Sequence, residues 1–127
     1  MTVAGRNTKV AKNYETTAWA MMRYSGLLLI PLVWFHVLWQ DVIIGVHQID
    51  PEYVLVRWSN IGIQIYDILL LAFAFAHGVN GLRQVLMDFI HKPKARRITS
   101  MVLFIFWIVI SAMGGIAIIA AAKAHLG

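Results

Sequence analysis

Residues 58–82 read WSNIGIQIYDILLLAFAFAHGVNGL, an apolar run with a single charged side chain, Asp67. A helix needs about 20 mostly apolar residues to cross the hydrocarbon core of a bilayer, so this run predicts a membrane-spanning helix. It also holds one histidine, His77. An ionisable side chain inside such a helix is costly unless another group satisfies it, which makes His77 a functional candidate.

The composition of the whole chain places it in a membrane. Its 127 residues are enough for one domain, and 60% of them are hydrophobic, 13% are charged, and the mean hydropathy is +0.70. These values lie outside the range of soluble domains. The chain has no cysteine, which excludes disulfides, thiolate chemistry and iron–sulfur clusters bound by this chain. The net charge of +5 does not predict nucleic acid as a partner, because the basic residues flank apolar runs.

Two further apolar runs have the length of a crossing. One extends from residue 24 to 46 and is interrupted only by Asp41, and the other covers residues 98–122 without a charge. The sequence therefore predicts an all-α integral membrane protein with three transmembrane helices, approximately residues 24–46, 60–90 and 98–122. Lys92-Pro93-Lys94 marks the turn between the second and third. We expect one membrane domain over residues 1–127, with residues 1–23 as a cytoplasmic segment rather than a signal peptide.

The positive charges predict the orientation of these helices. Nine of the eleven Lys and Arg residues flank the same side of the three runs, namely Arg6, Lys9, Lys12, Arg23, Arg83, Lys92, Lys94, Arg96 and Arg97. Because positive residues stay on the cytoplasmic side, the N-terminus is predicted inside and the C-terminus outside. The loop on the outer side is acidic.

Helical phase gives the second predicted helix one functional face. At about 100° per residue, one stripe contains Tyr66, Leu70, Phe73, His77, Gly81, Gln84 and Asp88. Along the helix axis, Asp88 is roughly 16 Å from His77. Gly78 and Gly81 leave room beside His77 for a flat macrocycle, although close helix packing also favours glycines.

The first predicted helix has its own stripe, which ends at a second histidine, His36. It lies about 18 Å along the helix from Tyr24, deeper in the bilayer than His77. Haem iron is the metal that suits a neutral imidazole between membrane helices, and the difference in depth favours two haems over one shared haem. Pro31 is expected to kink this helix or free a carbonyl.

Each histidine has a simpler alternative. His77 or His36 could donate a hydrogen bond to a backbone carbonyl of a neighbouring helix instead of binding a metal. The remaining histidines are expected to be solvated and without a role: His47, His91 and His125.

The charged residues near the span ends also have alternatives. Asp67 is expected to be an interfacial carboxylate, either reaching the membrane surface or paired with Arg57. Asp88 and Arg23 could neutralise each other or bind lipid headgroups. Arg83 is either an ordinary cytoplasmic anchor or a partner for a haem propionate. The third helix offers only small residues between 111 and 117, which predict a packing surface.

Two motifs in the sequence resemble those of a known family. Ala76-His77-Gly78-x-x-Gly81-Leu82-Arg83-x-x-x-x-Asp88, and Met22-Arg23-Tyr24-Ser25-Gly26 preceded by Trp19, are similar to the second-helix and first-helix motifs of the D-type membrane anchor of succinate dehydrogenase (complex II), a cytochrome b556-like subunit. The resemblance covers roughly residues 14 to 122.

The resemblance implies haem ligands. In that family the histidine matching His77 is an axial ligand of haem b, and the other ligand comes from the C-type partner anchor. Members with two haems use a first-helix histidine as well, which His36 matches. The three-helix chain is then expected to pack with its partner anchor into a bundle around haem.

The resemblance also implies a quinone site at the cytoplasmic edge. Its candidate residues here are Arg23, Tyr24, Ser25 and Asp88, with Asp88 as a proton donor. The position after Asp88 is a tyrosine in many members but Phe89 here, which cannot donate a hydrogen bond, so Tyr24 or a partner's residue would have to replace it. Two-haem members often use menaquinone, which favours it over ubiquinone.

The predicted function is therefore a haem b-binding anchor of succinate dehydrogenase that carries electrons from the iron–sulfur subunit to membrane quinone. FAD and iron–sulfur clusters belong to the flavoprotein and iron–sulfur partner subunits, so we expect no catalytic residue of succinate oxidation on this chain. The expected location is the cytoplasmic membrane of a bacterium or archaeon. A fumarate reductase anchor and a haem-free structural anchor are the alternatives; a small transporter is disfavoured, because the first span has no carboxylate before Asp41.

Overall fold

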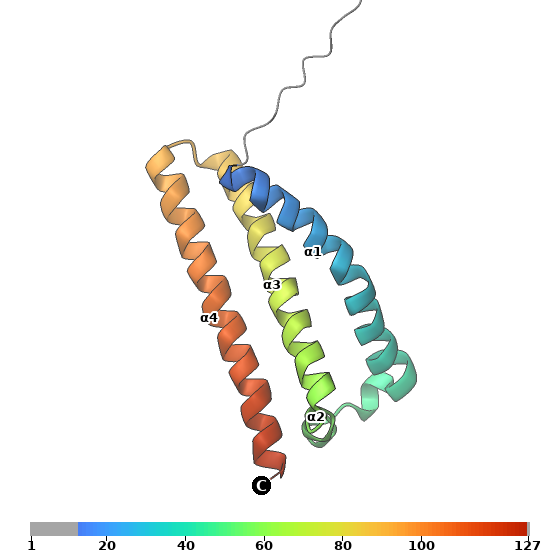
Figure 1. The fold of residues 1–127 in the computed structure, drawn as a ribbon. Coiled ribbons are helices and arrows are strands. Elements are labelled where there is room, and N and C mark those ends of the chain that lie inside the picture. The colour runs from blue at the N-terminus through green and yellow to red at the C-terminus, as the bar shows by residue number, and fades with distance from the viewer. Residues whose placement is uncertain (1–12, 127) are drawn as a thin grey trace, which may run out of the picture.

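A computed structural model describes residues 13–126, and in it three long helices lie side by side (Figure 1). They are α1 (Tyr14–Val37), α3 (Ile61–Phe89) and α4 (Pro93–Leu126). The central helix, α3, packs against both α1 and α4. All three are long and apolar enough to cross a membrane, which confirms the predicted all-α, three-span architecture.

Local signals explain where the helices begin and end. The Asn13 side chain accepts a hydrogen bond from the Thr16 amide at 2.9 Å and so caps α1. Asn60 caps α3 in the same way, through the amide of Gly62 at 2.9 Å. The predicted turn is confirmed, because α3 ends at Phe89 and Pro93 begins α4, a position where proline is favoured.

The helices extend beyond the predicted apolar spans at most ends. Helix α1 begins at Tyr14 rather than at residue 24 and continues without a break through Pro31. It then passes into a π-helical segment, Leu38–Gly45, and a short 3₁₀ turn, Val46–Gln48. Gly45 ends the π-helical segment at φ 89°, a conformation that glycine adopts without a steric cost. The predicted span 60–90 agrees with α3 within one residue.

The connection between α1 and α3 contains a short helix that the apolar pattern did not predict. It is α2, Pro51–Trp58, and Asp50 caps it by accepting a hydrogen bond from the Tyr53 amide at 2.7 Å. Helix α2 packs against both α3 and α4 and lies across their ends (Figure 1).

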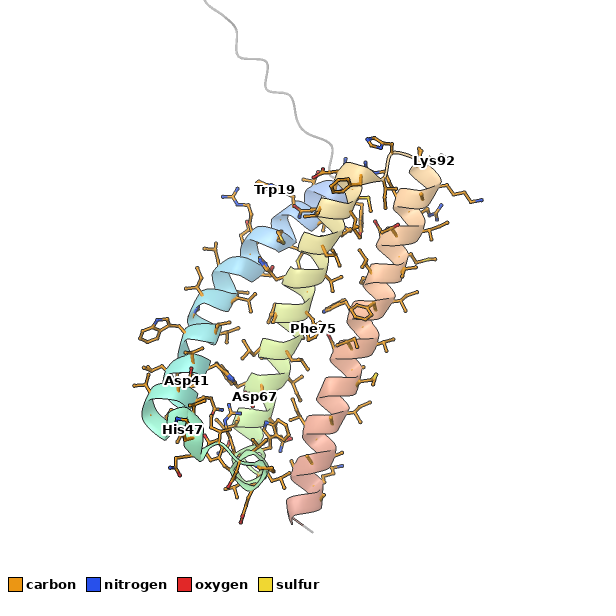
Figure 2. All side chains as sticks on the ribbon, turned by 180° about the vertical axis from the view of Figure 1, so that it is seen from behind. Trp19, Asp41, His47, Asp67, Phe75 and Lys92 are labelled. Atoms are coloured by element: carbon orange, nitrogen blue, oxygen red, sulfur yellow. The ribbon has the colours of Figure 1, made fainter. Side chains whose placement is uncertain are left out.

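The two ends of the bundle differ in charge as the sequence predicted. Trp19 and Lys92 lie at one end, whereas Asp41, His47 and Asp67 lie at the other (Figure 2). The first end also carries Arg83, Lys94, Arg96 and Arg97, since α3 finishes and α4 starts there. Arg6, Lys9 and Lys12 fall outside the described residues, as does the side chain of His125. The positive-inside rule predicts that this basic end is the cytoplasmic one.

Very little of the apolar surface is covered within this chain. The described buried apolar residues are Ala18, Met87, Ile118 and Ala122. In contrast, Ile30 is 66% exposed and Trp34 is 67% exposed. Such a surface is stable when lipid or partner helices cover it, as expected for an anchor within a larger bundle.

Gly114 and Gly115 let α4 approach α3, whereas Ala112 and Ala117, which belong to the same predicted packing surface, are exposed. A Cβ added at Gly114 would lie 2.3 Å from the Leu71 Cδ2 atom, whereas one at Gly115 would lie at an ordinary 3.9 Å from the Ile68 Cγ2 atom.

This difference predicts that Gly114→Ala is less stable than Gly115→Ala. The leucine must change rotamer to accept the new methyl group, which costs about 1 kcal/mol or more, while the helix-propensity gain is the same for both variants. Thermal denaturation of the detergent-solubilised protein measures the difference. Equal denaturation temperatures for the two variants would contradict this packing.

Candidate functional site

The side chain of His77 meets α1 at Ser25. The Ser25 Oγ atom lies 3.1 Å from the Nδ1 atom of His77 and 3.2 Å from the carbonyl oxygen of Met22. Ser25 is only 4% exposed, so this hydrogen-bonded group lies inside the α1–α3 interface. Within the described residues, the hydrogen-bond partner of His77 is thus a hydroxyl group rather than a backbone carbonyl.

Two glycines allow this close approach of α1 and α3. A Cβ added at Gly26 would lie 3.2 Å from the Cε1 atom of His77, and one at Gly81 would lie 3.0 Å from the Cε atom of Met22. By contrast, a Cβ at Gly78 would meet nothing within 4 Å. Gly81 therefore serves helix packing rather than a macrocycle, and only Gly78 leaves open space on the surface of α3.

The other ring nitrogen of His77 is available. Among residues 13–126, no group hydrogen-bonds Nε2, and the protein does not enclose this atom. The imidazole is thus held at Nδ1 and free at Nε2, the arrangement that a metal-binding histidine needs.

Arg83 is engaged within the chain. Its guanidinium group, 4% exposed, donates two hydrogen bonds to the Glu15 carboxylate, at 3.1 and 2.9 Å, and its Nε atom donates to Asn80 at 3.2 Å. Asn80 in turn donates to the Ala18 carbonyl at 2.8 Å. The carboxylate that Arg83 binds in this structure comes from Glu15, a residue to which the sequence pattern assigned no role. The predicted interaction of Arg83 with a haem propionate stays a prediction.

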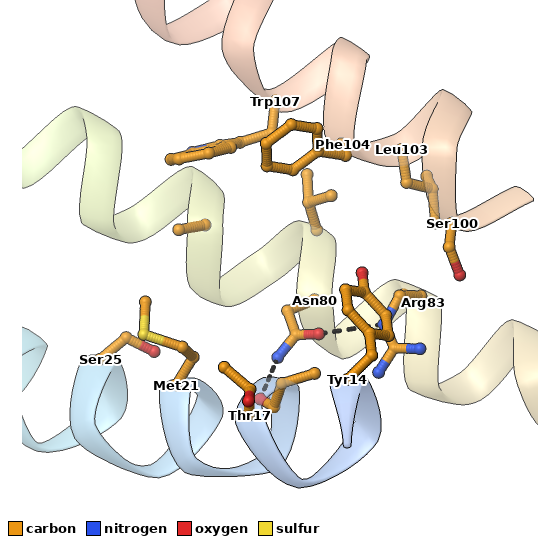
Figure 3. A pocket seen from close by; sticks show the side chains of 13 residues that line it. Tyr14, Thr17, Met21, Ser25, Asn80, Arg83, Ser100, Leu103, Phe104 and Trp107 are labelled. Carbon is orange, nitrogen blue, oxygen red and sulfur yellow. Dashed lines mark hydrogen bonds between the residues drawn. The ribbon is translucent and has the colours of Figure 1, made fainter. Parts of the chain in front are cut away.

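These residues border a cavity of about 200 Å³ between α1, α3 and α4 (Figure 3). Tyr14, Asn80 and Arg83 lie at its polar end, and Leu103, Phe104 and Trp107 line it from α4. The sequence did not reveal this cavity, because it depends on how three helices are placed relative to one another.

The predicted quinone residues are not brought together within this chain. Ser25 is buried against His77. Arg23 is exposed and lies over the Trp19 ring, 4.7 Å from its centroid, and Tyr24 is 66% exposed on the same helix. Asp88 lies on α3 beyond the level at which α1 begins, roughly 8 Å of helix rise past Arg83. No ion pair joins Arg23 and Asp88 in the described part of the chain.

A second polar group lies at the opposite end of the bundle, around Asp67. This carboxylate, 8% exposed, forms a bidentate ion pair with Arg57 and accepts a hydrogen bond from the Trp58 indole at 2.8 Å. The predicted pairing of Asp67 with Arg57 is confirmed. The His36 Nδ1 atom lies 3.8 Å from the Asp67 Oδ1 atom, and the His36 ring stacks on Tyr66 with a centroid distance of 6.5 Å.

The two histidines lie at different levels of the bundle. His77 faces Ser25, whereas His36 faces Tyr66 and Asp67. Ser25 and His36 are eleven residues apart on α1, and so are Tyr66 and His77 on α3. Eleven residues correspond to roughly 16 Å along a helix. Within residues 13–126, no cluster of three or more His, Cys, Asp or Glu side chains could hold a metal ion.

Comparison with known families decides the identity of this bundle. The model of the succinate dehydrogenase/fumarate reductase transmembrane subunit matches residues 4–116 of the 127. The chain belongs to this family. The membership inferred from the two motifs is confirmed, and the match includes His36, Ser25, His77 and Asp88. No curated protein matches the chain significantly.

The transmembrane subunit has a buried ion pair whose disruption should be costly. Asp67→Asn leaves the guanidinium of Arg57, 11% exposed, without its counter-charge, and we expect a loss of roughly 3 kcal/mol in unfolding free energy. Thermal denaturation of the purified complex measures the loss.

Two controls accompany this variant. Adding Arg57→Gln to Asp67→Asn removes both charges and should recover part of the stability. Glu52→Gln, at an exposed carboxylate of the same end, should have no effect. A single variant as stable as wild type would show that the pair contributes nothing.

Proposed function

We propose that this transmembrane subunit binds haem b through His77 and passes electrons from the iron–sulfur subunit of the complex to membrane quinone. One observation carries the proposal: the imidazole lies in an apolar helix interface, bonded at Nδ1 and free at Nε2. A free ring nitrogen in such surroundings calls for a partner, and haem iron is a suitable one.

The residues around His77 fit this group. Nε2 would hold the haem iron, and a further ligand would come from the C-type partner anchor, because the described residues include no other histidine at this level. A bound haem supplies one-electron transfer. Ser25 holds the imidazole, and Gly26 leaves room for the ring. Two turns toward the cytoplasmic end, the Gln84 Nε2 atom is enclosed without a hydrogen-bond partner among the described residues, which makes it a donor for a propionate alongside the predicted Arg83.

We propose a second haem at His36, on the outer side. Its support is the roughly 16 Å between the levels of the two histidines, which is too large for one shared haem. The enclosed His36 Nδ1 atom has no hydrogen-bond partner in the described chain and faces Asp67 at 3.8 Å. A carboxylate beside the second ring nitrogen is the common setting of a metal-binding histidine.

The proposed quinone site lies at the cytoplasmic edge and is shared with partner subunits. Asp88 and Phe89 are both exposed where α3 ends, and Arg23 and Tyr24 are exposed on α1. Because the two residues on α3 are separated from the two on α1 within the chain, a partner helix has to complete the pocket. Asp88 acts there as proton donor, and Arg23 stabilises reduced, anionic quinone. Menaquinone is the favoured quinone.

The family supports the proposed partners. The flavoprotein and the iron–sulfur subunit carry FAD and the clusters, and they dock at the basic cytoplasmic end, where Lys92, Lys94 and Arg97 are exposed. Succinate oxidation is the proposed direction; fumarate reduction would use the same residues in reverse. The proposed location is the cytoplasmic membrane of a bacterium or archaeon.

The haem proposal predicts the effect of two histidine variants. His77→Ala and His36→Ala should each remove one haem per flavin from the purified complex, because each substitution removes an iron ligand. Haem is quantified from the reduced-minus-oxidised b-type spectrum and flavin from its absorbance after extraction.

The exposed histidines His47 and His91, one at each end, provide matched controls, and their alanine variants should keep all haem. Full haem retention in His77→Ala would eliminate the central proposal. Retention in His36→Ala alone would reduce the number of haems to one. A wild-type complex without a b-type band would instead favour a haem-free anchor.

The quinone proposal predicts that Asp88→Asn slows quinone reduction while haem content stays normal. Loss of a positioned general acid typically costs about 100-fold, so we expect roughly that loss in succinate:quinone activity. Succinate oxidation with a soluble electron acceptor, which bypasses the membrane subunits, should be unchanged.

Asp41→Asn, at an exposed carboxylate of the opposite end, is the matched control. Normal quinone activity in Asp88→Asn would mean that a partner subunit supplies the proton.

A further inference from the structure

The hydroxyl of Ser25 has two neighbours and only one proton. Its oxygen lies 3.1 Å from the His77 Nδ1 atom and 3.2 Å from the Met22 carbonyl oxygen. A carbonyl oxygen can only accept, so the contact with Met22 uses the serine proton. A serine within a helix commonly bonds backward to a carbonyl of the preceding turn in this way.

The proton of the imidazole follows from this assignment. If the Ser25 proton points to Met22, the Ser25 oxygen is an acceptor, and the Nδ1 atom of His77 must donate. This arrangement satisfies the serine proton, the serine oxygen and the Nδ1 proton, and it leaves Nε2 with a free lone pair. The opposite arrangement would put a proton on Nε2, where no described residue accepts it, and an unsatisfied donor in apolar surroundings is costly.

We infer that Ser25 is the positioning residue of His77, fixing the tautomer and orientation in which Nε2 can bind iron and increasing the electron density of the ring. The hydrogen-bonded chain runs from Nδ1–H to the Ser25 oxygen and from the Ser25 proton to the Met22 carbonyl. Gly26 is needed for this hydrogen-bonded arrangement, because a Cβ there would lie 3.2 Å from the His77 Cε1 atom and would push the ring away from Ser25.

This inference rests on the proposed haem site. It assigns Ser25 to the support of the haem ligand His77 instead of to the predicted quinone site. A hydrogen bond from the second nitrogen of a metal-bound imidazole makes the ring a more basic ligand, which favours ferric over ferrous iron and lowers the reduction potential. A serine that only filled space would leave the potential unchanged.

The test compares Ser25→Ala with Ser25→Thr in the intact complex. Ser25→Ala removes the acceptor, and we expect a more positive midpoint potential of the haem bound by His77, together with roughly tenfold or greater weakening of haem binding. Ser25→Thr keeps a hydroxyl and should restore both properties toward wild type. Redox titration of the visible spectrum gives the potential, and haem transfer to apomyoglobin gives the binding.

Ser100→Ala provides a control at a serine of α4 in the same cavity and should change neither property. If Ser25→Ala does not assemble, Ser25→Cys substitutes a weak acceptor of similar size and should shift the potential in the same direction.

Unchanged potential and haem binding in the variants that lack the hydroxyl would overturn the inference. An equal shift in Ser25→Ala and Ser25→Thr would do so as well, because packing would then be the cause. Failure of the proposed function is distinct: it would appear as a wild-type complex without b-type haem, or as haem retained in His77→Ala.

Discussion

Polar groups inside a bilayer have no water to bind, so each needs a partner within the protein, and in this subunit some of the partners are backbone carbonyls of a neighbouring helix. Tyr66 donates to the Leu32 carbonyl, and Asn80 donates to the Ala18 carbonyl. These two bonds fix the register of α1 against α3 at both ends. Ser25 lies midway between Ala18 and Leu32, so this register brings it to within about one helical turn of His77. The placement of Ser25 against His77, on which the proposed haem site rests, therefore depends on interhelical bonds that involve neither residue.

The parts of the fold that could be predicted are those determined by local sequence. Apolar runs predicted three helices, and the segregation of charges predicted which ends lie together. Helix α2 could not be predicted, since its eight residues lack a long apolar stripe. The partner of Ser25 could not be predicted either, because it lies 52 residues away and depends on a register that no local pattern encodes. The family motif identified Ser25 and Gly26 as significant without revealing that both act on His77.

Helical phase places His77 and Gly81 on the same face of α3, but it does not predict which groups contact that face. Gly78 and Gly81 are equivalent in the sequence pattern as space beside His77, yet a Cβ added at Gly81 would meet Met22 and one added at Gly78 would meet nothing within 4 Å. In the same way Arg23, Tyr24 and Asp88 seemed to belong to one quinone site, whereas antiparallel packing puts Asp88 beyond the start of α1. In the proposed quinone site, this chain would thus contribute two separate edges, and quinone binding would be a property of the assembled complex.

The two histidines also differ in whether their Nδ1 atoms already have hydrogen-bond partners. His77 already has its Nδ1 bond at 3.1 Å, so its Nε2 would receive the proposed iron without a rearrangement of this bond. His36 is different, because its Nδ1 atom lies 3.8 Å from Asp67, a carboxylate that already accepts from Arg57 and Trp58. Closing that gap requires a shift of about 1 Å to reach hydrogen-bond distance. In the proposed sites, this chain alone therefore holds the imidazole of His77 in place, whereas His36 would need the tighter packing that a partner anchor or a bound haem would impose.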